Sequence, residues 1–81
     1  MLQNTRGDFM EIHKRISDLI EDGNIQVQVL AYKLGVTRQQ IARWRKGTSE
    51  PGAYKIKQLC EIYGVSADYI LGLPRGLDWP R

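Results

Sequence analysis

The chain has 81 residues, of which 42% are hydrophobic and 26% are charged, and its formal net charge is +3. A chain of this length has room for one compact core, because so small a domain buries only roughly 60% of the surface that its unfolded chain exposes. Its balance of apolar and charged residues is typical of globular proteins and excludes a disordered chain. No apolar run approaches the ~18 residues of a membrane-spanning helix and no signal-peptide pattern opens the chain, so we expect a cytoplasmic protein without a membrane partner.

The first predicted helix covers residues 8–22 and follows an N-terminal extension of residues 1–7. Asp8 is its candidate N-cap, and Gly23 is expected to end it in the left-handed conformation. Between these ends, apolar residues recur at three- and four-residue steps, which places them on one face of an amphipathic helix. These residues are Phe9, Ile12, Ile16, Leu19 and Ile20.

A second, shorter helix is predicted over residues 26–34 and a third over residues 38–46. Gly35 directly follows the second helix at the position that favours glycine. Thr37 and Gln40 form a capping-box pattern at the start of the third helix. The apolar positions of the two helices, which we interpret as core, are Val27, Leu30, Ala31, Leu34, Ile41 and Trp44.

Turn-forming residues predict a loop over residues 47–52, and two further helices follow it. The fourth helix carries apolar residues at positions 56, 59, 60 and 63 and ends at Gly64. The last begins after the capping residue Ser66, continues through Leu71 and is terminated by Gly72. Because no segment alternates with a period of two, the fold class is predicted to be all-α, a compact five-helix bundle over residues 8–73.

The sequence has one cysteine, Cys60, and one histidine, His13. A single cysteine cannot form an intramolecular disulfide, and these two residues alone do not make a zinc site, so we expect no metal and no cofactor. We interpret Cys60 as a small buried core residue and His13 as solvated surface. The sequence also lacks a nucleophile–base pair and a glycine-rich phosphate loop, so we expect neither an enzyme nor a small-molecule substrate.

The positive charge is concentrated in the middle third of the chain. Residues 30–57 hold seven basic residues and one acidic residue, whereas residues 1–29 hold three basic and five acidic residues, and residues 58–81 hold two and three. A basic patch is what a polyanion such as DNA attracts, although a solvated cationic face gives the same count.

A sterically specific pattern lies within residues 26–46. Two helices that cross steeply through a short turn need a small residue where they approach, which Ala31 provides, and a turn residue that accepts a positive φ, which Gly35 provides. Ile41 then fills the angle between the helices. This pattern predicts a helix-turn-helix motif.

Residues 15–73 resemble the phage-repressor family of helix-turn-helix regulators, the lambda-repressor-like or Cro/cI-type group. The matching segments are LAYKLGVTRQQIARWRKG over residues 30–47, Pro51, and IYGVSADYILGL over residues 62–73. The resemblance implies a five-helix bundle whose second and third helices form the motif. It also implies a transcriptional repressor or regulator that binds near-palindromic double-stranded DNA as a homodimer.

In that family the third helix enters the major groove, so the resemblance implies that Arg38, Gln39 and Arg43 face base edges. Arginine can contact guanine, and glutamine can contact adenine, through two hydrogen bonds each. Arg38 also lies at the positive end of its helix dipole, where a cation is unfavourable by ~0.3–1 kcal/mol, which favours a bound anion or base as its explanation. For Gln40 the sequence leaves two alternatives open, a helix cap and a DNA contact.

Further polar residues around the third helix are candidate phosphate contacts, which set the register of a protein on DNA without reading its sequence. For Arg45 a solvated charge is the equal alternative. These candidates are Gln28, Thr37, Arg45, Lys46, Thr48 and Ser49.

Two positions depart from the family pattern. Val27 stands where the family usually has a phosphate-binding glutamine, for which Gln26 or Gln28 is a substitute. Arg45 and Ile20 stand where many members have a glutamate and a basic residue that balance each other, so both halves of that ion pair are missing.

The main alternative function is a protein–protein adaptor or antitoxin-like subunit built on the same bundle, because a fold alone does not define a function. An adaptor would present aromatic or aliphatic anchors on the third helix, where this sequence has charged and amide groups. The C-terminal tail, residues 74–81, carries Leu77 and Trp79, and the sequence does not decide between packing on the bundle and contributing to a dimer.

Overall fold

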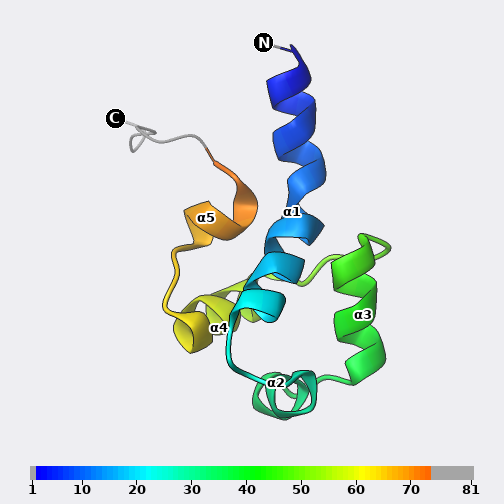
Figure 1. Ribbon diagram of the computed structural model, residues 1–81, viewed down its shortest axis with the longest axis vertical. Helices are drawn as coiled ribbons and strands as arrows, with labels where there is room; N and C mark the ends of the chain where they lie inside the picture. Colours follow the sequence, from blue (N-terminus) through cyan, green and yellow to red (C-terminus); the bar gives the residue numbers. More distant parts are fainter. Residues whose placement is uncertain (1, 74–81) are drawn as a thin grey trace.

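The computed structural model describes residues 2–73, and their side chains from Ile12 onward. This part of the chain contains five α-helices and no strand, which confirms the all-α fold class (Figure 1). The predictions for the tail, including Leu77 and Trp79, and for the side chain of Phe9 lie outside the described residues. The helices are α1 Leu2–Asp22, α2 Val27–Leu34, α3 Arg38–Lys46, α4 Ala53–Tyr63 and α5 Ala67–Leu71.

The start of α1 was predicted wrongly. The helix begins at Leu2, so the expected extension of residues 1–7 is helical from residue 2, and Asp8 lies inside the helix and does not cap it. Neither proline nor a stop pattern separates residues 2–7 from the amphipathic segment. The one glycine among them, Gly7, lowers helix propensity by about 1 kcal/mol without terminating the helix.

Gly23 has a different role from the one expected. Among the described residues, the glycines with positive φ are Gly35, Gly47, Gly64 and Gly72, and Gly23 is not one of them. A Cβ at Gly23 would lie 2.6 Å from Cε1 of Tyr63 and 2.9 Å from the carbonyl oxygen of Leu19. Glycine is therefore needed there because the Tyr63 ring approaches the backbone closely.

The other helices lie close to their predicted ranges because local signals define their ends. The Thr37 hydroxyl accepts a hydrogen bond from the Gln40 backbone N–H (3.1 Å), and the Ser66 hydroxyl accepts one from the Tyr69 N–H (3.3 Å). Both are side-chain N-caps of the kind that the sequence predicted. The fourth helix starts at Ala53, before its apolar stripe, and residue 52 occupies the N-cap position without a side-chain cap.

The core is a single cluster to which all five helices contribute. Cys60, which was expected to be a small buried core residue, packs against this cluster and is partly buried. Burial nevertheless raises the pKa of the Cys60 thiol, which keeps it in the neutral form. The buried hydrophobic residues of the core are Ile16, Ile20, Leu30, Ala31, Leu34, Ile41, Trp44, Leu59 and Ile70.

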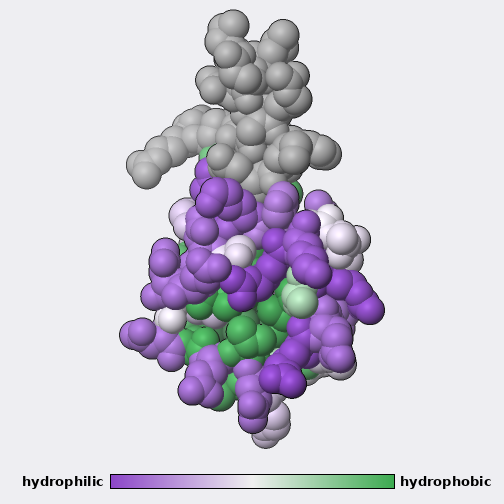
Figure 2. Space-filling model, turned by 45° about the vertical axis from the view of Figure 1, so that its right-hand side comes forward, coloured by the Kyte–Doolittle hydropathy of each residue, from purple (hydrophilic) through white to green (hydrophobic). Residues whose placement is uncertain are grey.

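The long helix α1 organises the bundle, with α3 and α5 packed against it on opposite sides (Figure 1). The second helix contacts α3 and α4 and closes one end of the bundle. Within residues 2–73, no helix is long and apolar enough to span a lipid bilayer. Figure 2, turned so that the α3 side of Figure 1 comes forward, shows a mostly hydrophilic face around a smaller hydrophobic area.

Candidate nucleic-acid interface

The second and third helices are joined by a tight turn of three residues, Gly35 to Thr37. Gly35 has φ 73°, and its N–H and that of Val36 both donate to the carbonyl oxygen of Ala31, at 2.8 and 3.0 Å. A Cβ at Gly35 would meet no atom within 4 Å, so glycine is favoured there by its backbone conformation and not by lack of space. Ala31 is buried, as a small residue at a helix crossing should be.

The third helix buries one side and exposes the other. Ile41 and Trp44 are both in the core, with Trp44 only 3% exposed, which confirms the prediction that this tryptophan packs inward. The polar side chains of the opposite side lie at the surface. The exposed residues of α3 are Arg38, Gln39, Gln40, Ala42, Arg43 and Lys46.

Gln40 takes part in the cap through its backbone, while its side chain is exposed. In the described part of the chain, the Gln40 amide does not return a hydrogen bond to the backbone of Thr37. Only the Thr37 half of the expected capping box is formed. The Gln40 side chain is therefore not committed to the cap.

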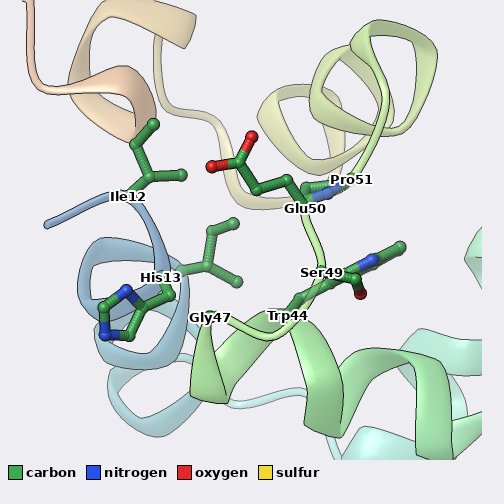
Figure 3. A pocket seen from close by; sticks show the side chains of 8 residues that line it. Ile12, His13, Trp44, Gly47, Ser49, Glu50 and Pro51 are labelled. Carbon is green, nitrogen blue, oxygen red and sulfur yellow. The ribbon is translucent and has the colours of Figure 1, made fainter. Parts of the chain in front are cut away.

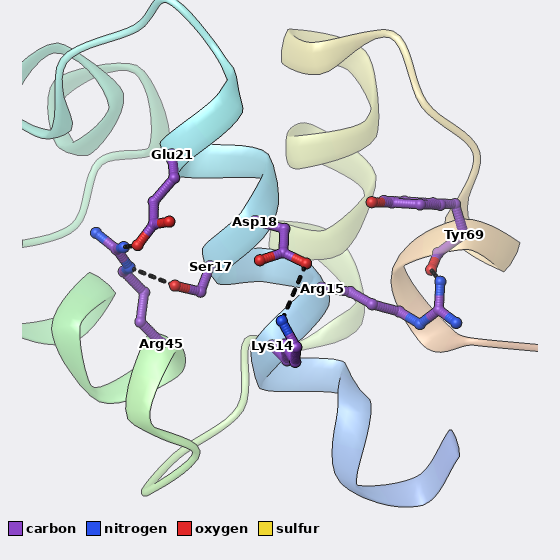
Figure 4. Close-up of polar contacts among 7 residues, drawn as sticks. All are labelled: Lys14, Arg15, Ser17, Asp18, Glu21, Arg45 and Tyr69. Carbon is purple, nitrogen blue, oxygen red and sulfur yellow. Dashed lines mark hydrogen bonds and ion pairs between the residues drawn. The ribbon is translucent and has the colours of Figure 1, made fainter. Parts of the chain in front are cut away.

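Arg45 is engaged within the fold. Its Nε donates to the Ser17 hydroxyl at 3.0 Å, and its Nη2 lies 2.7 Å from Oε2 of Glu21 (Figure 4). An ion pair between the end of α1 and α3 is thus present, with the acidic residue on α1 and the basic residue on α3. The family pattern places the partner of residue 45 at Ile20 and not at the neighbouring Glu21, so the sequence did not predict this pair. Of the two alternatives for Arg45, the solvated charge was wrong.

The candidate phosphate contacts lie on three elements around α3. Gln28 is exposed in the first turn of α2, Thr37 is exposed at the N-cap of α3, and Lys46 is exposed at its C-terminal end. The Thr48 hydroxyl donates to the carbonyl oxygen of Arg43 at 3.3 Å and so helps to cap the end of α3. Ser49 is half-buried in the loop that follows.

Ser49 borders a pocket of about 240 Å³ between α1 and the loop after α3. His13 lines the same pocket and is half-buried, so the prediction that it is solvated surface was wrong. Its ring lies against the α3 C-cap, since a Cβ at Gly47 would be 3.0 Å from Nδ1 of His13. Figure 3 shows the carboxylate of Glu50 across the pocket from His13.

Five of the seven basic residues of the middle third divide into two groups, those with partners within the fold and those exposed on α3. Lys55 donates from Nζ to the carbonyl oxygen of Leu34, where the negative end of the α2 dipole favours a cation. Lys55 and Arg45 are therefore both half-buried and both have partners within the fold. Arg38, Arg43 and Lys46 remain exposed on α3, so the third helix keeps its positive charge toward solvent.

Two short helices joined by a glycine turn, the second with an exposed basic face, define a helix-turn-helix protein. A family model described as Helix-turn-helix matches residues 16–70, and the chain belongs to this family, which is of the Cro/C1 type. An uncharacterized HTH-type transcriptional regulator of Haemophilus influenzae is 40% identical over 40 residues, which are 49% of this chain and 17% of that protein. The chain thus corresponds to a small part of that relative. No solved structure gives a significant match.

Proposed function

We propose that the chain binds double-stranded DNA sequence-specifically and regulates transcription, with α3 in the major groove. The observation that carries the proposal is that Ile41 and Trp44 anchor one side of α3 while Arg38, Gln39 and Arg43 are exposed on its surface. Their guanidinium and amide groups suit guanine and adenine edges, and the N-terminal part of such a helix is what reaches the bases. Gln40 is a fourth candidate, since its amide is exposed.

Phosphate contacts follow from the same placement. We assign them to polar residues that flank α3 and that form no ion pair in the described part of the chain. These residues are Gln28, Thr37, Lys46 and Ser49. Thr48 joins them when its hydroxyl, which donates to the carbonyl oxygen of Arg43 in the free protein, turns to donate to a phosphate. Arg45 is left out because Ser17 and Glu21 hold its Nε and Nη2 against α1. The contacts would hold the register and supply most of the non-specific affinity.

The family and the relative support the regulatory part of the proposal. Because the chain belongs to the Cro/C1-type family, we infer a non-catalytic role in DNA binding. The Haemophilus protein is described as a transcriptional regulator. We further propose, from the resemblance to phage repressors, that two copies bind a near-palindromic operator and repress transcription. A closed twofold dimer matches the symmetry of such a site.

The test is a selection of binding sites from a pool of random duplexes by the full chain. We expect enrichment of a short motif, and an affinity that falls steeply as salt is raised from 50 to 200 mM, as phosphate contacts require. Enrichment of no motif, together with salt-independent binding, would favour the adaptor alternative. In that case a protein partner should be captured from solution. A partner that binds Arg43→Ala as well as the wild type docks on a surface other than the exposed side of α3.

A further inference from the structure

Arg45 joins α3 to α1 through two acceptors that lie one helical turn apart. Its Nε donates to the Ser17 hydroxyl at 3.0 Å and its Nη2 to Oε2 of Glu21 at 2.7 Å. Ser17 and Glu21 are four residues apart and so share one face of α1. A single guanidinium therefore spans a full turn of α1 (Figure 4), and its planar fork fixes a direction as well as a distance.

Apart from the His13 ring at the α3 C-cap, the side chains that α1 and α3 share in the core are apolar. Ile41 and Trp44 of α3 belong to the same buried cluster as Ile16 and Ile20 of α1. Apolar burial is non-directional, so it holds the helices together without strictly defining the rotation of α3 about its axis. The Arg45 pair supplies the directional contact that the apolar cluster lacks.

The arginine of this pair is better shielded from solvent than the cation of an ordinary surface pair. The Arg45 side chain is 29% exposed and Glu21 is 64% exposed, whereas Lys57 and Glu61, which pair on α4 at 3.7 Å, are 67% and 66% exposed. Fully exposed pairs are weakened by solvent and salt. The comparison marks Arg45 as a structural contact and supplies a control pair elsewhere in the molecule.

Rotation of α3 determines where the candidate base-reading side chains point. Arg43 precedes Arg45 by two residues, which is about 200° around an α-helix. Holding Arg45 against α1 therefore turns Arg43 to the far side of α3, where it is exposed. Recognition groups must be held within about 0.5 Å and 10–20° of their working geometry, so a small rotation would matter.

We propose that Arg45 is a positioning residue for base recognition: its bonds to Ser17 and Glu21 set the rotation of α3, and Arg45 itself contacts no phosphate. This inference rests on the proposed function, in which α3 reads the major groove. It assigns Ser17 and Glu21, which lie on another helix, an indirect part in sequence specificity.

The deciding variant is Glu21→Gln, which keeps the size of the side chain and removes its charge. We expect an about threefold loss of affinity for the duplex selected by the wild-type chain. The bond from Arg45 loses its charge-assisted part, and the exposure of Glu21 limits the size of the effect. Affinity for a random duplex of the same length, and the slope of log affinity against log salt, should not change. Fluorescence anisotropy at several salt concentrations measures all three quantities.

The rival roles for Arg45 predict other results. If Arg45 contacts phosphate, Glu21→Gln removes a competitor for its guanidinium, so affinity for both duplexes should rise, and Arg45→Gln should reduce the salt slope by about one. If the pair only stabilises the fold, the variant should lower Tm and leave both affinities unchanged. Either result would overturn the proposal.

Arg45→Gln and the double variant complete the test. We expect Arg45→Gln to lose specificity as Glu21→Gln does, and the double variant to be no worse than Arg45→Gln, because the two side chains act as a unit. Additive losses would contradict the proposal. Glu61→Gln, which removes the carboxylate of the exposed α4 pair, is the matched control and should leave the specificity ratio unchanged.

A measurement without DNA separates this inference from the proposed function. If the selection enriches no duplex, the proposed function fails, but the orientation of α3 can still be measured in the free protein. Residual dipolar couplings of the α3 amides should change in Glu21→Gln and not in Glu61→Gln. Unchanged couplings in Glu21→Gln would refute the positioning role.

Discussion

At the scale of single residues, Tyr63 shows how a close contact constrains two positions at once. Its ring lies against the backbone at Gly23, where even a methyl group would be 2.6 Å from Cε1. Its hydroxyl oxygen is buried and has no hydrogen-bond partner among the described residues. Burial raises the pKa of Tyr63, while the positive charge of Arg45 acts more weakly in the opposite direction.

We expect Tyr63→Phe to keep or increase stability, by up to about 1 kcal/mol, because it removes a buried polar group that lacks a partner. The folded-state pKa of Tyr63 is raised above the ordinary value of 10.0. In the wild type, the part of the free energy of unfolding that depends on this pKa is therefore fully present below pH 10. It is lost as the pH rises through the folded-state pKa. Urea unfolding at pH 7 and above pH 10 measures both effects, and a clearly destabilised variant would show that the hydroxyl makes a bond.

Arg43 is the residue at which the proposed function is tested most directly. Its side chain is exposed on α3, so Arg43→Ala should leave the fold intact. We expect relaxed specificity at one or two base pairs, with a loss of about 1–3 kcal/mol of discrimination. Repeating the duplex selection with the variant measures this, and Lys57→Ala, which removes an exposed cation on α4, is the control. An unchanged motif would exclude Arg43 as a base contact.

At the scale of elements, the start of α3 combines a structural and a candidate functional role in Thr37. Its hydroxyl accepts a hydrogen bond from the Gln40 N–H and is also a candidate phosphate contact. Thr37→Ala should cost about 1 kcal/mol of stability through loss of the cap. Ser66→Ala removes the equivalent cap of α5 and should lower Tm comparably. Only Thr37→Ala should also weaken DNA binding, and equal effects of the two variants on binding would remove Thr37 from the interface.

The crossing of α2 and α3 depends on a small side chain at Ala31, which is only 6% exposed. Ala31→Leu should destabilise the protein by about 1–3 kcal/mol, because added methyl and methylene groups would force the helices apart. The same change at Ala42, which is exposed on α3, provides the control and should be nearly neutral. Thermal unfolding followed by circular dichroism compares the two variants. An unchanged Tm for Ala31→Leu would show that the helix crossing can accommodate a larger side chain.

At the scale of the whole molecule, the basic middle third of the chain is only partly directed to solvent. Lys55 donates to the carbonyl oxygen of Leu34, whereas Lys46 is exposed at the end of α3. We expect Lys46→Gln to weaken binding to all duplexes and to reduce the salt slope by about one. Lys55→Gln should instead lower Tm and leave the slope unchanged. The opposite pattern would mean that the DNA-facing side of the molecule has been assigned wrongly.

The sequence by itself determined the positions and ends of α2 to α5, because these depend on local chemistry. Capping hydroxyls at Thr37 and Ser66, left-handed glycines such as Gly35, and apolar residues at helical spacing act within a few residues of themselves. The same spacing identified the buried side of α3, and with it the exposed side that carries the candidate base contacts. The start of α1 was not predictable in this way, since no capping or stop signal marks it.

Only the tertiary structure decided which partners meet across the chain. Arg45 with Glu21, Lys55 with the carbonyl oxygen of Leu34, His13 with Gly47, and Tyr63 with Gly23 are separated by 21 to 40 residues. Helical periodicity defines the face on which a side chain lies, but the packing angle of two helices defines what that face touches. For this reason, Arg45 and Lys46 are equivalent as neighbouring charges in the sequence, whereas in the folded molecule one is bound to α1 and the other faces solvent.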